Sequence, residues 1–189
     1  MYNRRMVRRW LPGVVGVLIG AILLAAGYWK FPVTPFSVPV KLISGETAVI
    51  SGTLPSNAWV GSQADLQVMF QFTSPVKGNK AQIRAEIVMP YVTTVPGGQL
   101  TLNTDPAETT HLAWEITPNE KGDLDGTLWI NCAVDGGEMQ AVLARRFQLH
   151  ALAFLGISAP WIRRIGLGFL ILGTFYLAAF AGRQSRARK

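Results

Sequence analysis

The sequence has very little of the chemistry from which catalytic and metal sites are usually built. It contains one cysteine, Cys132, and two histidines in 189 residues. A single cysteine excludes an internal disulfide framework and a cysteine-rich zinc or iron–sulfur site. Charged residues make up 15% of the chain and hydrophobic residues 49%, a balance that excludes an intrinsically disordered protein. We therefore expect no catalytic residue, no cofactor and no metal site.

Acidic residues are absent from both ends of the chain. All eleven lie between Glu46 and Glu138, and eight basic residues lie between Lys30 and Arg146, so the middle of the chain (residues 30–146) carries a net charge of −3. The formal net charge of +7 therefore comes from elsewhere. Two basic clusters contribute four positive charges each: Arg4, Arg5, Arg8 and Arg9, and Arg183, Arg186, Arg188 and Lys189. Because the folded part is negative, we do not expect nucleic-acid binding.

Two long stretches without a charged residue lie close to these clusters: LPGVVGVLIGAILLAAGY and IGLGFLILGTFYLAAFA. Trp10 and Trp29 bracket the first and lie about 28 Å apart along a helix, close to the thickness of a bilayer hydrocarbon core. Trp161 precedes the second stretch. The pattern predicts transmembrane helices over residues 11–29 and 161–182, with the three tryptophans as interface anchors.

Both short basic ends outweigh the charges on the other side of each helix. By the positive-inside rule, we expect residues 1–10 and 183–189 to be cytoplasmic, in contact with membrane lipids, and the domain between the helices to lie outside the cytoplasm. This arrangement predicts a two-span protein of a prokaryotic plasma membrane. Arg163 and Arg164 lie at the outer end of the second helix and oppose this topology.

The first apolar stretch has a second interpretation as a cleaved signal peptide. A basic segment, an apolar segment and the small residues Ala25, Ala26 and Gly27 fit that pattern. The length of the stretch and its ending in Tyr28 and Trp29 favour an uncleaved anchor. Membrane attachment is expected in either case, because the second helix remains.

Glycines are placed on one face of each predicted helix. The helix-packing candidates are Gly13, Gly16 and Gly20 in the first and Gly166 and Gly173 in the second. Gly16 and Gly20 form a small-xxx-small motif, which lets helix backbones approach closely. The two helices of one chain could pack as a hairpin, or they could pack against another membrane subunit.

Between the helices the hydrophobic residues alternate with polar ones. Residues 30–43 contain several prolines and predict a stalk that leads into an edge strand. Alternation in residues 44–158, separated by turns such as Asp135-Gly136, predicts seven to nine short strands in an antiparallel β-sandwich. The clearest buried faces are Leu66, Val68, Phe70 and Phe72; Ile83, Ala85, Ile87 and Met89; Leu112, Trp114 and Ile116; and Leu128, Ile130 and Cys132.

One segment of the sandwich resembles a known architecture. Leu112-Ala113-Trp114-Glu115-Ile116-Thr117-Pro118, followed by Gly122 and Leu128-Trp129-Ile130, is similar to the late strands of bacterial membrane-anchored immunoglobulin-like modules. The resemblance covers roughly residues 44 to 155 and carries no specific family. It implies an all-β, immunoglobulin-like sandwich flanked by an N-terminal and a C-terminal transmembrane helix. The paired inter-sheet cysteines of antibody domains are missing.

A copper site of the cupredoxin kind is the first chemistry to test in such a sandwich. It needs a histidine and usually a methionine a few residues after the cysteine. After Cys132 the next histidine is His150, too far along the chain. We therefore interpret Cys132 as a small core residue.

The other candidate groups are isolated. His111 and Glu115 share a strand face but stand about 13 Å apart along it, too far for a direct hydrogen bond. His150 has no evident carboxylate partner. Asp123 and Asp125 flank a glycine turn and resemble a calcium loop only faintly, so a solvated turn is the simpler interpretation.

The sequence thus predicts a non-catalytic membrane protein whose sandwich binds another membrane or envelope protein, as an accessory or scaffolding subunit. The alternative is a surface-tethered module that binds a ligand or glycan. Trp59 and Trp129 are the candidates for its stacking platform. The alternative loses its only candidate residues if both rings are buried.

Overall fold

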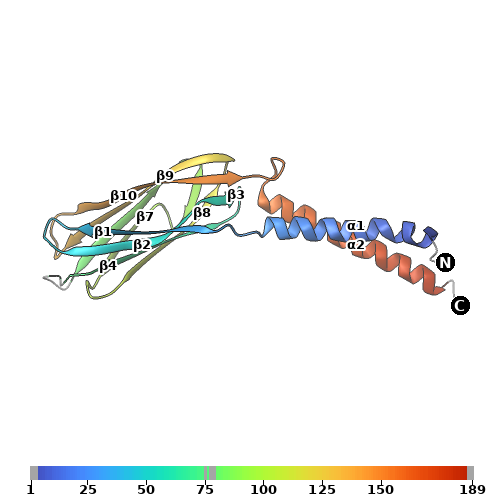
Figure 1. Ribbon diagram of the computed structural model, residues 1–189, viewed down its shortest axis with the longest axis horizontal. Helices are drawn as coiled ribbons and strands as arrows, with labels where there is room; N and C mark the ends of the chain where they lie inside the picture. The colour runs from blue at the N-terminus through green and yellow to red at the C-terminus, as the bar shows by residue number, and fades with distance from the viewer. Residues whose placement is uncertain (1–3, 75, 77–79, 187–189) are drawn as a thin grey trace. The chain divides into compact units, whose positions relative to one another are not determined.

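The structure, a computed structural model, describes residues 4–74, 76 and 80–186. It divides into two units (Figure 1). One comprises the residues up to Trp29 together with those from Phe154 onward, and the other is Lys30–Ala153. The first unit holds the two long helices, and the second holds all the named strands.

Ten strands form the second unit, arranged in two five-stranded sheets. The first sheet has the order β1 (Val33–Lys41), β2 (Thr47–Pro55), β4 (Ala64–Phe72), β8 (Thr110–Pro118) and β6 (Val92–Val95). The second has the order β3 (Asn57–Trp59), β10 (Gln140–Leu152), β9 (Gly122–Val134), β5 (Ala81–Val88) and β7 (Gln99–Thr104). All pairings are antiparallel except that of β3 with β10. The predicted number of strands, seven to nine, was too small because β3 and β6 are too short to show alternation.

The two sheets enclose a hydrophobic core built from the alternating residues. Leu66, Val68 and Phe70 of β4 are buried, and so are Leu112 and Trp114 of β8. In the second sheet the buried positions include Ile83, Ala85, Leu128, Ile130 and Cys132. Each of these strands therefore buries one face, as the period of two predicts.

The strand β1 extends the sandwich beyond the expected boundary at residue 44. Val33–Lys41 pairs along its whole length with Thr47–Pro55. Residues 33–41 of the predicted stalk therefore form an edge strand. The two prolines inside it are tolerated because an edge strand needs backbone donors on one side only.

The first unit is built from α1 (Arg4–Gly27) and α2 (Ala159–Arg186). The helices lie side by side and run antiparallel (Figure 1). Trp10–Gly27 and Ala159–Ala181 are long and apolar enough to cross a membrane, and most of their residues are not buried inside the structure. A helix in the core of a soluble protein would be mostly buried. These two helices are compatible with a two-span membrane protein.

Candidate functional site: the helix seam and the free sheet edge

Small residues line the contact between α1 and α2 at every seventh position. They form three facing pairs: Gly13 with Gly173, Gly20 with Gly166, and Gly27 with Ala159. A Cβ atom added to Gly20 would lie 2.7 Å from both the carbonyl oxygen of Gly166 and the backbone nitrogen of Leu170. The two backbones are therefore too close for any side chain at this position.

The structure brings all five predicted packing glycines into one seam within a single chain. Gly16 lies between the first two of these pairs along α1. A Cβ atom there would be 3.4 Å from the Cα atom of Gly173, an ordinary contact. The tight contacts thus follow a seven-residue period rather than the Gly16–Gly20 spacing of four. A seven-residue period is typical of left-handed helix pairs.

The predicted anchor tryptophans lie near the helix ends. Trp10 makes an edge-on contact with Phe180, with ring centroids 5.5 Å apart. Trp29 and Trp161 are exposed, as a ring at a membrane interface would be.

Arg163 has a structural partner at the end of α1. Its Nε atom donates a hydrogen bond of 2.7 Å to the carbonyl oxygen of Gly27, the last residue of that helix. Its guanidinium also stacks 4.3 Å from the ring centroid of Tyr28. A cation at a helix C-terminus satisfies a free carbonyl and opposes the helix dipole. Arg163, one of the two arginines that oppose the expected topology, therefore has a structural role within the helix pair.

The topogenic basic residues lie at the far ends of the two helices. Arg4, Arg5, Arg8 and Arg9 fall within α1, and Arg183 and Arg186 fall within α2. Arg188 and Lys189 lie outside the described residues. The orientation expected from these charges stays a prediction.

The expectation that His150 has no carboxylate partner is wrong. Its Nδ1 atom lies 2.5 Å from Oδ1 of Asp123. The two residues are directly opposite in the pairing of β9 with β10, where a bulge between Ala141 and Leu143 shifts the register. Without that shift His150 would face Gly122. Both side chains are about half exposed or more, so the pair contributes little to stability.

The interpretation of Asp123 and Asp125 as part of a solvated turn is also wrong, because both lie within β9. His111 and Glu115 are exposed on β8, and Glu115 accepts a hydrogen bond of 2.7 Å from Gln63. Across the described part of the chain, no three His, Cys, Asp or Glu side chains are grouped as a metal ion would require.

Cys132 is fully buried in the core of the second sheet. Burial, and to a smaller extent the negative charge of Glu46, raises the pKa of its thiol from 9.0 to about 11. Only the thiolate reacts with alkylating reagents. The position therefore behaves as the core residue expected from the sequence.

This gives a direct prediction for thiol labelling. At pH 8 the raised pKa alone lowers the thiolate fraction of Cys132 about 100-fold, because each pKa unit is a factor of ten. We expect iodoacetamide to label the folded protein at least about 100-fold more slowly than the chain unfolded in guanidinium. Mass spectrometry of timed samples measures both rates. Equal rates would show that Cys132 is accessible in the folded protein.

Trp59 and Trp129 do not form a common platform. Trp59 is half-buried and packs against Phe31, with ring centroids 5.6 Å apart, whereas Trp129 is 41% exposed. In the second sheet Trp59 lies beside Leu152 and Trp129 lies beside Ala144. Eight residues along β10 correspond to about 26 Å. The two rings are therefore too far apart to stack on one sugar.

Three of the four sheet edges are protected against pairing with another strand. The strand β1 carries Pro35 and Pro39, which lack backbone donors. Beside it, the guanidinium of Arg145 lies 4.8 Å from the ring centroid of Phe36. The edge strands β3 and β6 have only three and four residues. Short strands, prolines and charges near an edge are the usual means of protecting it.

The fourth edge, β7, is longer than β3 and β6 and has neither proline nor charge in its own sequence. It is six residues long, QLTLNT, and contains no proline and no charged residue. It pairs with β5 on one side, and within the described residues no strand pairs with its other side. The whole stretch 90–104, which includes β6 and β7, lacks a charged side chain. Depletion of charge is typical of the buried centre of a protein interface.

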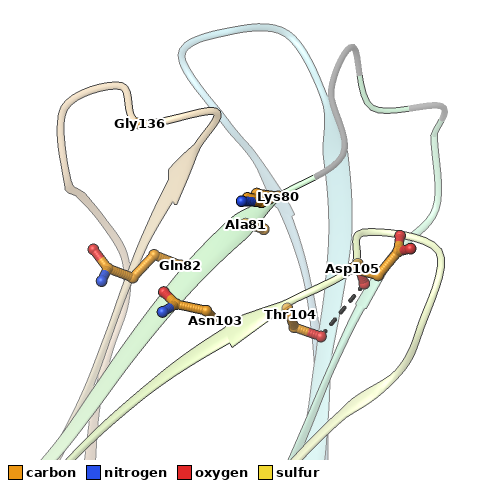
Figure 2. A pocket seen from close by; sticks show the side chains of 7 residues that line it. All are labelled: Lys80, Ala81, Gln82, Asn103, Thr104, Asp105 and Gly136. Carbon is orange, nitrogen blue, oxygen red and sulfur yellow. Dashed lines mark hydrogen bonds between the residues drawn. The ribbon is translucent and has the colours of Figure 1, made fainter.

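A polar hollow of about 450 Å³ lies at the end of β7. Figure 2 shows its lining, in which Gln82 of β5 and Asn103 of β7 are cross-strand neighbours. Lys80 and Asp105 lie at its rim and are exposed. The hollow offers hydrogen-bonding groups at the surface but no enclosed cavity, so the free edge is the better candidate for a binding site.

Comparison with known proteins identifies no family. No family profile matches the sequence, and no curated protein is significantly similar. The chain is instead a two-sheet β-sandwich with a long apolar helix at each end. Its likeness to immunoglobulin-like proteins is one of architecture only.

Several solved structures share parts of this arrangement at low similarity. A chain of the complex between zinc 2-glycoprotein and prolactin-inducible protein from human seminal plasma is 7% identical, with a TM-score of 0.42, covering 66% of this chain and 98% of that chain. The CARDB domain of a Pyrococcus furiosus protein is 15% identical, with a TM-score of 0.36, covering 66% and 93%. A lipoprotein from Bacteroides thetaiotaomicron is 12% identical, with a TM-score of 0.31, covering 67% and 85%. These similarities are too low to carry an argument about function.

Proposed function

We propose that this protein is a non-catalytic, two-span membrane protein whose sandwich binds another protein outside the cytoplasm. The observation that carries the proposal is the unprotected, uncharged edge at β7. An exposed strand edge offers free backbone donors and acceptors to an incoming strand. In this proposal the protein acts as an accessory or scaffolding subunit of a membrane or envelope assembly.

The two ends of the chain support the membrane part of the proposal. The apolar helices pack through glycines, as helices do where no hydrophobic effect drives them together. The basic clusters at their far ends support a cytoplasmic position of both termini, by the positive-inside rule. Lipids contact the exposed helix faces, and the proposal involves no cofactor and no nucleic acid.

Photo-crosslinking from the two edges of the sandwich tests the binding part. A photoreactive amino acid at Thr101 in β7 is expected to form a discrete protein adduct in membranes. The matched control carries it at Ser37, which is exposed on the proline-protected edge β1, and is expected to form none. If Thr101 gives no adduct, or both positions give the same adducts, the proposed binding edge is wrong.

Protease protection tests the topology. The sandwich is expected to be digested in right-side-out vesicles and protected in inverted ones. Digestion only when the cytoplasmic face is exposed would reverse the proposed orientation.

A further inference from the structure

We propose that the protein bound at β7 is a second copy of this chain, joined by antiparallel pairing of β7 with β7. The inference rests on the proposed function, since it names the partner of the same edge. The two second sheets would then form one continuous ten-stranded sheet across a two-fold axis. A two-fold interface requires one surface to be complementary to itself.

The sequence of β7 meets this requirement. The pairing with β5 places Gln99, Thr101 and Asn103 beside Glu86, Arg84 and Gln82 on the outer face. The intervening Leu100 and Leu102 therefore face the other sheet. The strand is thus polar and uncharged on one face and apolar on the other.

Antiparallel pairing centred on Thr101 matches like with like. Thr101 then faces Thr101 of the second copy, Leu100 faces Leu102, and Gln99 faces Asn103. Leu102 is 37% exposed in the single chain and would be covered by the leucine opposite. Cross-strand pairs of this kind stabilise sheets, whereas directly opposed like charges destabilise them.

The nearest charge on the outer face does not prevent the contact. Arg84 lies on β5 beside Thr101 and donates a hydrogen bond of 2.8 Å to Gln99. In the paired form, Arg84 and its copy are three strand spacings apart, about 14 Å. That separation exceeds the Debye length of about 8 Å at physiological ionic strength, so their repulsion is largely screened.

A six-residue strand pair is a small interface, and confinement to the membrane compensates for this. Two sandwiches anchored in one membrane meet at a much higher effective concentration than free ones. Antiparallel pairing turns Val33 and Leu152 of the two copies to opposite ends of the joined sheet, so the proposed dimer has its strands running along the membrane surface. The association is therefore expected in membranes and lost on dilution in detergent.

Cysteine crosslinking in membranes of the full-length protein tests the register. Facing residues in an antiparallel pair have Cα atoms about 4.5–5.5 Å apart, within the range for a disulfide. On mild oxidation, Thr101→Cys is expected to give at least about tenfold more disulfide dimer than Asn103→Cys, whose two copies would be about 13 Å apart along the strands. Ser37→Cys on β1 and the unaltered chain, whose Cys132 is buried, are expected to give background levels.

A second change tests the apolar face. Leu102→Lys in the Thr101→Cys chain is expected to reduce the dimer about tenfold or more, because a lysine would be buried opposite Leu100 in each of the two symmetry-related pairs. The inference is overturned if Thr101→Cys dimerises no more than Ser37→Cys, or if Asn103→Cys dimerises equally well. An adduct of the photoreactive Thr101 variant with a different protein would also overturn it, while leaving the proposed binding edge standing.

Discussion

Replacing Gly20 by leucine is expected to separate the two helices. A Cβ atom at Gly20 would lie 2.7 Å from backbone atoms of Gly166 and Leu170, and backbone cannot move aside as a flexible side chain can. Overpacking of this kind costs about 1–3 kcal/mol or more. Helix association in lipid depends on such close packing, so the loss falls directly on the hairpin.

Gly168→Leu is the matched control, because a Cβ at Gly168 meets nothing within 4 Å. A short bis-maleimide that bridges Trp10→Cys and Phe180→Cys reports the paired state, since these side chains are in contact. Bridging is expected to fall about tenfold with Gly20→Leu, corresponding to about 1.4 kcal/mol, and to be unchanged with Gly168→Leu. Equal bridging in both variants would show that the seam does not hold the helices together.

Trp114→Ala is expected to destabilise the sandwich by about 3–5 kcal/mol, the usual cost of deleting a fully buried large aromatic side chain. Trp114 is only 1% exposed and lies in the core between the sheets. Its Nε1 atom has no hydrogen-bond partner among the described residues. Trp114→Phe is therefore expected to cost less, because it also removes an unsatisfied buried donor.

Trp129→Ala is the control for this series. Trp129 is 41% exposed on the outer face of β9, so its removal is expected to change stability by no more than about 0.5 kcal/mol. Urea denaturation of the full chain in detergent, followed by near-ultraviolet circular dichroism, measures all three variants. A larger loss at Trp129 than at Trp114 would contradict the assignment of the core.

The strands could be predicted from sequence wherever one face alternates over several residues. Leu66, Val68 and Phe70 illustrate this, because they alternate along β4 and all three are buried in the core between the sheets. The strands β3 and β6 could not, since three or four residues hold too few alternations to stand out. Their pairing is set by the longer strands β10 and β8 beside them.

The site residues divide in a similar way. The helix face that carries Gly13, Gly20 and Gly166 follows from periodicity, which is a local property. The contact of Gly27 with Ala159 in the helix seam was not predicted, because it depends on which residues of the two helices lie opposite each other. A seven-residue count through Gly13, Gly20 and Gly27 would have found the first of them.

The contact between His150 and Asp123 shows a different limit. A hairpin centred on Asp135 and Gly136 specifies an approximate register, but the bulge near Leu143 moves every later pair by one residue. One residue decides which side chain stands opposite which. No signal in the strand composition marks that bulge.

The seam between α1 and α2 also acts on the sandwich, through chain entropy. The contact between Gly27 and Ala159 closes a loop of roughly 130 residues that contains all the named strands. A covalent bridge closing a loop of this size lowers the conformational entropy of the unfolded chain and so raises its free energy by on the order of 4–5 kcal/mol at 25 °C. A helix pair that stays formed in the membrane holds the two ends of this loop together non-covalently and restricts the unfolded chain in the same way. The sandwich is therefore expected to refold from a loop whose two ends are already held together. Separating the helices with Gly20→Leu is expected to lower the free energy of unfolding of the sandwich, although no residue of a strand is changed.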